Sequence, residues 1–441
     1  MDTSSREHDL VLYGATGFVG RLIAAYVAEH APAGMRVGLA GRSMSRLATV
    51  RSQLPVAAQA WALIEADSED ADSIAALAAN TRVLFTTVGP YAKHGLPVVD
   101  ACARAGTHYA DLTGEVSFVR EAIDCYDALA RTSGARIVHS CGYDSVPSDL
   151  AVLMLHQAAE ADGAGGLVEV QLVATAKAGI SGGTLESMRG QLDAMRLSPA
   201  LRSLAADPYA LSPDRTREPT TQQPPDSGPV RHSDDGTWTA PFIMAPFNTR
   251  IVRRSNALQG WAYGRSLQYG EVMGVARGPA GAVIARAMAL GLRAFTGAMA
   301  FPPTRRVLDR SLPAPGAGPT TSMQRAGWFH SQVTARTEDG HRYQAVAAGP
   351  GDPGYAATAV MAGETALALA LDGDRLPAAK GSLTPATALG NVLIQRNGEF
   401  PGMNEVYGEF FDKPYPARTT VSAGLGPGMK VEIDGIAVLS G

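Results

Sequence analysis

The stretch Asp9–Gly20 constrains the fold of this chain more than any other. It starts with a short apolar run, typical of a buried parallel strand, and three glycines follow at three-residue intervals, Gly14, Gly17 and Gly20. An amphipathic segment, Arg21–His30, comes next. The order of strand, glycine turn and helix is the context that a dinucleotide-binding motif requires.

Each glycine meets a physical demand of such a site. We expect Gly14 to turn the chain tightly out of the strand, Gly17 to let the backbone approach a pyrophosphate, and Gly20 to let the helix pack closely on the strand. The unpaired N–H groups at the start of the helix would face the phosphates. Thr16 and Phe18 lie between these glycines and belong to the predicted cofactor-binding turn.

The second predicted strand, Arg36–Ala40, indicates which dinucleotide is bound. Arg42 and Ser43 follow it, and no Asp or Glu lies between residues 37 and 54. An NAD site usually has a carboxylate about 20 residues beyond the glycines to bind the ribose 2′-hydroxyl, whereas an arginine there accommodates a 2′-phosphate. We therefore predict NADPH, with Arg42 and Arg46 binding the phosphate. The alternative for Arg42 is a solvated residue at a helix start.

Two further predicted strands end in residues that would line the cofactor. Asp67 ends the third apolar run and would lie near the adenine, although capping of the next helix explains it nearly as well. Val88, Gly89 and Pro90 follow the fourth run, Arg82–Thr87. In a doubly wound sheet this loop lies at the carboxyl edge, beside the nicotinamide.

The alternation of strand and helix continues to about residue 150. Two more strands, Tyr109–Asp111 and Arg136–Ser140, flank a helix over Val116–Ser133, and both end in polar loops that contain glycine. The pattern predicts an α/β fold, a Rossmann-type doubly wound parallel sheet whose loops share one edge. The substrate should bind at this edge.

Candidate catalytic residues lie in these loops. Tyr91 and His94 follow the fourth strand, and Tyr143 and Asp144 follow the sixth. A phenol or an imidazole could donate a proton or polarise a carbonyl group. A set of loop-fixing hydrogen bonds explains Tyr143 and Asp144 equally well, and His139 is expected to be a core or supporting histidine. The sequence holds no metal-ligand constellation, so we expect no metal.

Charge and cysteine content exclude several classes of protein. The chain has 38 basic and 42 acidic residues, a net charge of −4 that does not favour nucleic acid as a partner. Three cysteines without metal-ligand spacing, and an N-terminus without an apolar signal region, indicate a reduced cytoplasmic enzyme.

One apolar segment, Ala282–Phe301, deserves comparison with a membrane span. Arg286 and Arg293 interrupt it at a spacing that places both on one helical face, which argues against a span. We expect a partly buried helix of a domain, with peripheral contact to a membrane as the alternative.

Several motifs, in this order, resemble the saccharopine dehydrogenase-like oxidoreductases: GATGFVG, LAGRS, TTVGPY, THYADLTGE and CGYDSVPSDL. The chain is more similar still to the trans-acting enoyl reductases of actinobacterial polyketide lipid synthesis, of the phthiocerol dimycocerosate type. That similarity extends through GGTLESM, DPYALSPDR, APFNTRIVRRSNAL, GDPGYAATAV and LTPATALG. It covers residues 7 to 395.

The resemblance implies a second α+β domain whose sheet covers the active site. It also implies that NADPH reduces an enoyl thioester, so the partners would be a carrier-bound acyl or polyketide substrate and its synthase. Two alternatives stay open, because a dinucleotide fold guarantees binding but not turnover. One is a non-catalytic NADP-binding sensor or scaffold, and the other is a saccharopine-type dehydrogenase acting on a secondary amine of an amino acid.

The predicted domain organisation follows from these patterns. Residues 1–150 form the NADP-binding domain, 151–350 the α+β substrate domain with a mobile loop over 206–239, and 351–396 a helical segment that returns to the first domain.

A basic cluster in the second domain consists of Arg250, Arg253 and Arg254. It would meet the phosphopantetheine or the acidic surface of a carrier protein, or else form a solvated face.

Residues 397–441 resemble a different family. NEVYGEFF, PARTTV and VEIDGIAVL are similar to the C-terminal part of the YjgF/Rid reactive-intermediate deaminases. In that family the arginine of PART, here Arg418, binds a substrate carboxylate, and the glutamate of VEI, here Glu432, helps to position water. The earlier strands of such a domain are missing, so this segment is a tail fragment.

Overall fold

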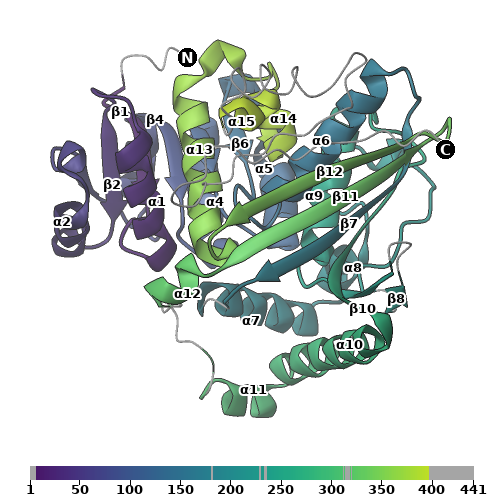
Figure 1. Ribbon diagram of the computed structural model, residues 1–441. Helices are drawn as coiled ribbons and strands as arrows, with labels where there is room; N and C mark the ends of the chain where they lie inside the picture. The colour runs from purple at the N-terminus through teal and green to yellow at the C-terminus, as the bar shows by residue number, and fades with distance from the viewer. Residues whose placement is uncertain are drawn as a thin grey trace, which may run out of the picture.

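Two β-sheets, each packed against helices, form the structure (Figure 1). The computed structural model describes residues 6–179, 182–227, 230–232, 236–310, 312, 318 and 320–396.

The first sheet has seven parallel strands in the order β13-β6-β5-β4-β1-β2-β3. Its central strands are apolar and buried along most of their length, because helices cover both faces of the sheet. This order confirms the predicted Rossmann-type sheet. The strands are β1 (His8–Tyr13), β2 (Val37–Gly41), β3 (Ala62–Glu65), β4 (Thr81–Thr86), β5 (His108–Ala110), β6 (Arg136–Val138) and β13 (Gly381–Leu383).

Helices α1 and α13 pack on one face of this sheet, and α3, α4 and α5 on the other. Helix α13 lies far along the chain but packs against α1, where the Tyr26 hydroxyl donates a hydrogen bond to Glu364 at 2.6 Å. The helices of this part are α1 (Phe18–His30), α2 (Met44–Gln53), α3 (Ala71–Ala79), α4 (Tyr91–Ala105), α5 (Val116–Ser133), α6 (Val146–Ala161), α13 (Thr358–Leu371), α14 (Pro385–Leu389) and α15 (Asn391–Arg396).

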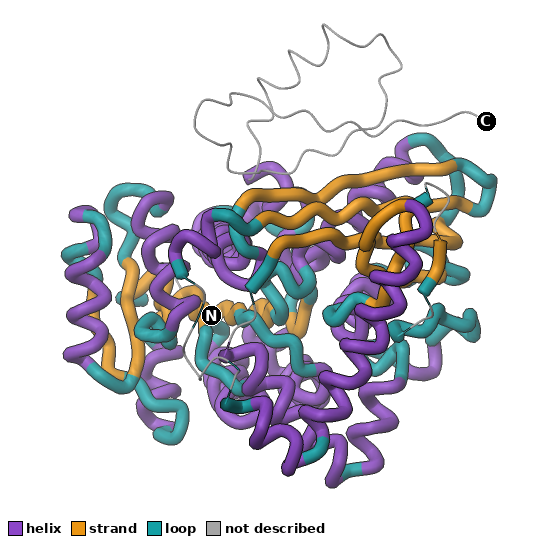
Figure 2. Tube along the Cα trace, turned by 60° about the horizontal axis from the view of Figure 1, so that its bottom comes forward, coloured by secondary structure: helices purple, strands orange, loops and turns teal. Residues whose placement is uncertain are grey.

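The second sheet has six strands in the order β12-β11-β7-β10-β9-β8, and only the pair β7–β10 is parallel. Buried and exposed residues alternate along β11, which is typical of a sheet covered on one face. Figure 2 shows its long strands running side by side over helices. The strands are β7 (Leu167–Lys177), β8 (Arg231–His232), β9 (Thr237–Pro241), β10 (Gln268–Arg277), β11 (Trp328–Thr337) and β12 (Arg342–Pro350).

The second α+β domain is thereby confirmed. Its helices are α7 (Gly182–Leu197), α8 (Pro199–Ala206), α9 (Ala245–Leu258), α10 (Gly278–Ala300), α11 (Pro302–Leu308) and α12 (Thr321–Arg325). Short turns of 3₁₀ or π helix occur at Val56–Ala58, Arg215–Arg217, Pro353–Ala357 and Gly373–Arg375.

The basic cluster on α9 is buried, so both predictions for it are wrong. Arg250, Arg253 and Arg254 are each no more than 3% exposed. Arg254 donates to the carbonyl oxygens of Leu211 and Ser382, both at 2.6 Å, and Arg250 forms an ion pair with an aspartate. Burial lowers the pKa of Arg253 to about 10 and that of Arg254 to about 9. These guanidinium groups therefore hold the interior together and cannot reach a carrier protein.

The described part of the predicted mobile loop, 206–239, is packed on the rest of the chain. Ala210 and Leu211 are fully buried, and Gln223 donates to the carbonyl oxygen of Leu267 at 2.8 Å. Asp226 is the ion-pair partner of Arg250. The polar composition of this segment therefore supplies partners for buried arginines, while its mobility stays a prediction.

Candidate functional site

The turns after β1 and β4 touch each other at the centre of the first sheet. Gly14 has a φ of +89°, a conformation that side chains rarely adopt. A Cβ atom there would lie 2.7 Å from Thr87 Oγ1 and 2.9 Å from a methyl group of Val88. A Cβ atom at Gly20 would overlap the carbonyl oxygen of Gly14. Glycine is therefore required where the strand, the first helix and the neighbouring loop meet.

The start of α1 suits an anion. Gly17 is the N-cap and is exposed, no side chain caps the helix, and its first turn has no acidic residue. Free N–H groups at a helix start are satisfied by capping side chains, water or a bound anion, and a phosphate takes this place in dinucleotide folds. Thr16 is half-buried beside this turn, and the ring of Phe18 packs edge-on against Tyr355 at 4.9 Å. The residues present therefore fit a pyrophosphate.

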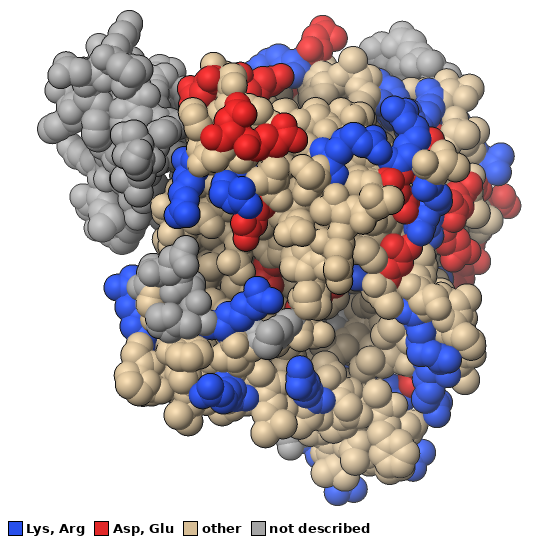
Figure 3. Space-filling model, turned by 90° about the vertical axis from the view of Figure 1, so that its right-hand side faces the viewer, with Lys and Arg blue, Asp and Glu red and all other residues tan. Residues whose placement is uncertain are grey.

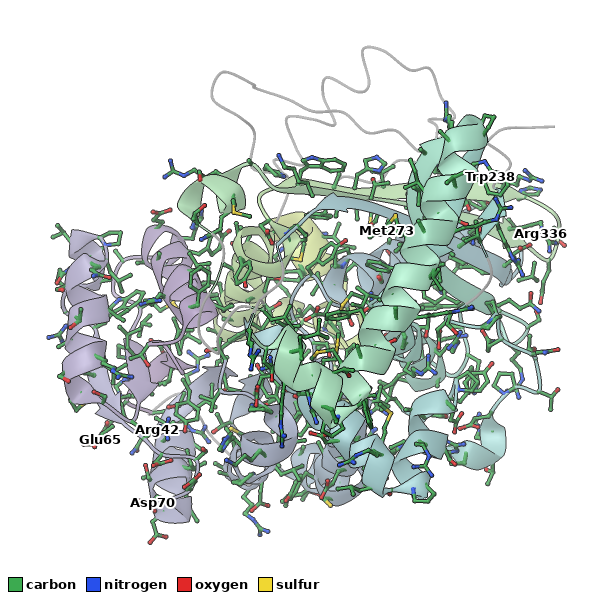
Figure 4. The ribbon with its side chains drawn as sticks, turned by 90° about the horizontal axis from the view of Figure 1, so that it is seen from below. Arg42, Glu65, Asp70, Trp238, Met273 and Arg336 are labelled. Atoms are coloured by element: carbon green, nitrogen blue, oxygen red, sulfur yellow. The ribbon has the colours of Figure 1, made fainter. Side chains whose placement is uncertain are left out.

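The carboxyl ends of β2 and β3 form the adenine end of the candidate cofactor site. Arg42 and Arg46 are exposed, and the Ser43 hydroxyl caps α2 by accepting from the backbone N–H of Arg46 at 3.4 Å. In Figure 4 the labelled Arg42 and Glu65 lie at the same end of the sheet, as the pairing of Gly41 with Glu65 requires.

Asp67 does not cap the next helix, so the alternative interpretation of this residue is wrong. The cap of α3 is Asp70, whose side chain accepts from two backbone N–H groups of that helix. Asp67 instead accepts from the N–H of Glu69 at 3.1 Å, which shapes the turn after β3. Its place at the adenine end agrees with the cofactor prediction, but its contact with a cofactor stays a prediction.

His94 lies on the same side as Arg42, away from the loop after β6. Its Nδ1 atom is 3.2 Å from the hydroxyl of Ser68, at the end of β3. Partial burial and the nearby Lys93 lower the pKa of His94. The position of His94 therefore favours contact with the adenine half of a cofactor over proton transfer to the substrate.

Tyr91 is buried, and its hydroxyl already has two partners. The hydroxyl donates to the carbonyl oxygen of Thr86 and accepts from the N–H of Leu112, both at 3.2 Å. Burial raises the pKa of this phenol well above its ordinary value. These bonds join the loops after β4 and β5, so the geometry favours a structural role for Tyr91 over a catalytic one.

Glu115 is a residue whose role the sequence analysis missed. Its carboxylate accepts from the N–H groups of Tyr91 and Ala92, at 3.1 and 2.9 Å, and so caps α4 from the neighbouring loop. It also accepts from the Ser187 hydroxyl of α7 at 2.9 Å, which links the two domains. Sequence shows a glutamate at a strand end, but not that it caps a helix that begins 24 positions earlier.

Tyr143 lies where the two domains meet. Its N–H donates to Thr358 Oγ1 at 3.0 Å, and its ring packs edge-on against Phe329 of β11 at 5.1 Å. Its hydroxyl is buried and finds no hydrogen-bond partner among the described residues. Burial, and then the negative charge of Glu271, raise its pKa above the ordinary value. A protonated donor thus lies in the interdomain region next to the Ser331 side chain, without a hydrogen bond of ordinary geometry to the described residues.

Two carboxyl groups near this tyrosine have a pKa raised by burial to about 7. One belongs to Asp144, and the other to Glu271 of β10. Glu271 accepts from the Tyr269 hydroxyl at 2.7 Å and from the Asn248 side-chain amide at 2.9 Å. Glu271 was not predicted, because an acidic residue in an alternating strand resembles a solvated one.

His139 is a core histidine, as predicted. It is 1% exposed, and its Nδ1 atom lies 2.7 Å from Asp111. Asp111 also accepts from the Tyr109 hydroxyl and from the N–H of Ser140, so it organises the loop after β6. Within the described ranges, no three His, Cys, Asp or Glu side chains are grouped to hold a metal ion. Arg418 and Glu432 lie outside the described residues.

Val88, Gly89 and Pro90 lie between the glycine turn and the start of α4, with Gly89 exposed. The structure thus groups the predicted site residues in two places along one sheet edge. The glycine turn, Arg42, Ser43, Asp67 and His94 lie toward β2 and β3. Tyr143 and Asp144 lie toward β6, under the second domain.

Known proteins resemble this chain in sequence and in fold. Residues 10–138 match the family model described as the saccharopine dehydrogenase NADP binding domain, which supports an NADP(H) cofactor. Residues 386–439 match the family described as endoribonuclease L-PSP, which confirms the resemblance of the C-terminal segment. A solved saccharopine dehydrogenase (L-Glu forming) from Saccharomyces cerevisiae shares the fold, with a TM-score of 0.51, 12% identity, and coverage of 89% of this chain and 97% of that one.

Curated relatives are much more similar in sequence. A candidate trans-acting enoyl reductase of Mycobacterium tuberculosis is 47% identical over 406 residues, which cover 90% of this chain and 96% of the relative. A trans-acting enoyl reductase of Mycobacterium bovis is 44% identical over 423 residues, covering 92% and 99%. Both domains of the structure lie within these matches. The chain belongs to the trans-acting enoyl reductase family, with a saccharopine dehydrogenase-type NADP-binding domain.

Proposed function

We propose that this chain is an NADPH-dependent trans-acting enoyl reductase that reduces an enoyl thioester of a carrier-bound polyketide or fatty-acyl intermediate in lipid biosynthesis. The observation that carries the proposal is the 44–47% identity to relatives named for this activity, which extends over both domains. The partner would be the synthase that holds the carrier.

NADPH is preferred over NADH in this proposal. When bound, it supplies the hydride for the β-carbon of the enoyl group. Arg42 and Arg46 would bind the 2′-phosphate, since both are exposed at the end of β2, where an NAD site would have a carboxylate. The uncapped start of α1 would bind the pyrophosphate.

Tyr143 would donate a hydrogen bond to the thioester carbonyl oxygen. A buried polar group without a partner costs about 1–3 kcal/mol, so a substrate oxygen that accepts from this hydroxyl is stabilised there. Because burial keeps the phenol protonated, the bond persists at neutral pH. It strengthens as negative charge develops on the oxygen during reduction.

Asp144 would protonate the α-carbon. A general acid works best when its pKa is close to the operating pH, and burial raises the pKa of Asp144 to about 7. Its neighbour in sequence, Tyr143, would hold the carbonyl oxygen of the same thioester. Tyr91 and His94 would then support the site through the loops and the cofactor, without a proton-transfer step.

Purified chain, NADPH and an enoyl thioester of pantetheine test the proposal. We expect NADPH oxidation, a loss of about 10²–10³ in kcat for Tyr143→Phe, and a loss of about 10²–10⁴ for Asp144→Asn, with NADPH affinity unchanged in both. Tyr126→Phe, at a half-buried tyrosine of α5, is the matched control. In wild type the rate should fall as the pH rises above about 7, and Asp144→Asn should remove this dependence.

Two results would contradict the proposal. Tight NADPH binding without oxidation by any enoyl thioester would favour a sensor or scaffold. Oxidation only with a keto acid and an amine would favour a saccharopine-type dehydrogenase.

A further inference from the structure

Helices α10 and α11 expose several large apolar side chains to solvent. In Figure 1 both helices lie at the bottom of the molecule, and α10 lies beneath β8 and β10 of the second sheet. Of the large apolar side chains on and between them, six are well exposed. They are Val283 (67% exposed), Ile284 (46%), Met288 (38%), Leu290 (70%), Phe301 (59%) and Val307 (63%), which together we call the α10 surface.

The apolar side of α10 faces away from the protein. The helix packs on β9 and β10 through Gly281 and Ala285, and the Arg286 guanidinium lies 5.6 Å from the ring centre of Trp238. With 3.6 residues per turn, residues 283, 287, 290 and 294 form one stripe on the opposite side, and all four are apolar. Surface helices of water-soluble domains normally turn a polar side to water.

The exposure of α10 does not follow from its apolar composition alone, because an equally apolar helix of the same chain is buried. By length and composition, α10 and the stretch Pro353–Leu371 are equally apolar, with a mean hydropathy of 1.3. Within their most apolar windows, 72% of the second stretch is buried, as expected of a core helix, against 17% of α10. An apolar surface of this extent in a folded protein indicates a partner.

The segment that carries this surface is basic, although one of its arginines, Arg305, is already paired with Asp193 of α7. Between residues 277 and 308 the chain has five arginines and no aspartate or glutamate. In Figure 3 the lower part of the molecule, which holds α10 and α11, is mainly tan with blue groups. The arginines are Arg277, Arg286, Arg293, Arg305 and Arg306.

We propose that the α10 surface rests on an anionic lipid bilayer. Apolar side chains beside arginines match the boundary between acyl chains and phosphate groups, where interfacial helices lie. A second copy of the chain fits less well, since a two-fold interface would bring two arginine-containing surfaces together. The two arginines within α10, together with its packing on β9 and β10, argue against a span.

This placement would bring the candidate active site close to lipid. Arg305 of α11 forms an ion pair with Asp193 of α7 at 2.7 Å, and Ser187 of the same helix bonds to Glu115 beside the cofactor loops. One helix therefore connects the α10 surface with the catalytic edge. A membrane-bound enzyme would meet long acyl intermediates without first drawing them through water.

Cosedimentation of the full chain with vesicles tests the proposal, and its outcome does not depend on reductase activity. We expect binding to vesicles of phosphatidylcholine with phosphatidylglycerol, weaker binding at high salt, and little binding to phosphatidylcholine alone. Val283→Ser with Leu290→Ser should weaken binding at least tenfold. Val56→Ser, which changes an apolar residue 89% exposed in the first domain, should not.

The charge contribution is tested separately. Arg293→Glu with Arg306→Glu should weaken binding to the anionic vesicles at least tenfold, whereas Arg342→Glu, at an exposed position of β12, should leave it unchanged. NADPH affinity, measured in parallel, should stay unchanged in all variants and shows that they are folded.

Three results would overturn the proposal. The first is no binding to either kind of vesicle. The second is equal binding to neutral and anionic vesicles. The third is a dimer in solution that Val283→Ser with Leu290→Ser dissociates, while vesicles do not bind, because the occupant would then be a second copy of the chain.

Discussion

Arg42 should decide between NADPH and NADH, and the structure allows the size of its effect to be worked out. The side chain is exposed at the end of β2 and makes no hydrogen bond or ion pair with the part of the chain that the structure describes. Removing it should therefore leave the free energy of unfolding within about 0.5 kcal/mol of wild type. Any loss of affinity then reports on the cofactor alone.

A hydrogen bond to a charged group contributes about 1.5–3 kcal/mol. Since 1.4 kcal/mol is about a tenfold change in affinity, Arg42→Ala should raise the Kd for NADPH about 10- to 150-fold. NADH has no 2′-phosphate, so its Kd should hardly change. Arg42→Asp should go further, because a carboxylate would repel the phosphate of NADPH and accept from the ribose 2′-hydroxyl of NADH.

Titration of both cofactors, followed by their fluorescence, measures these effects. Arg342→Ala, an exposed arginine on β12, is the matched control and should change neither Kd. Arg46→Ala should give a smaller loss for NADPH, because this residue lies one turn further along α2. An unchanged Kd for NADPH in Arg42→Ala, or an equal loss of affinity for NADPH and NADH, would contradict a contact between Arg42 and the 2′-phosphate.

Two further predictions concern stability. Burial raises the pKa of Asp149 to about 7. The free energy of unfolding of wild type should therefore fall as the pH rises from about 4 to 7, because the buried carboxyl group loses its proton. In Asp149→Asn this fall should be smaller by up to about 4 kcal/mol. Urea unfolding at pH 5 and pH 8 measures the change in unfolding free energy, and an equal change in both proteins would contradict the prediction. Gly20→Ala should cost about 1–3 kcal/mol in thermal unfolding and weaken NADPH binding, because the added methyl group overlaps a backbone oxygen of Gly14. Gly190→Ala, with open space around it, should cost nothing; equal Tm values for the two alanine variants would refute the packing argument.

The first domain could be predicted from the sequence because its signals are local. A buried parallel strand is a continuous apolar run, and the glycines of the first turn are required by contacts within a few residues. The exception is β13, which pairs with β6 although about 240 residues separate them in the chain. Nothing in the three residues Gly381–Leu383 indicates that they extend the first sheet.

The second domain shows what sequence patterns leave out. Arg253 and Arg254 occur in a polar helix and were interpreted as accessible charges. In the structure they donate to backbone carbonyl oxygens of Tyr269, Leu211 and Ser382, which belong to three different segments. A buried guanidinium is tolerated when acceptors surround it, and those acceptors are brought together only by the tertiary fold.

The two candidate tyrosines show how the second domain defines the catalytic edge. Tyr91 and Tyr143 both follow strands of the first sheet, and sequence gave no reason to separate them. The partners of the Tyr91 hydroxyl, Thr86 and Leu112, both lie in the first domain. The hydrogen bonds of this phenol therefore do not depend on the second domain.

Tyr143 differs from Tyr91 because its neighbours belong to segments of the chain beyond residue 150. Thr358, which lies 215 positions away, accepts from its N–H, and Phe329 of the second sheet packs on its ring, while its hydroxyl is left buried without a partner among the described residues. Covering a hydroxyl without pairing it costs free energy, so the arrangement is stable only if the rest of the interdomain packing compensates. A substrate oxygen would remove that cost. The closure of the second domain is therefore what turns one of two similar loop tyrosines into a candidate hydrogen-bond donor.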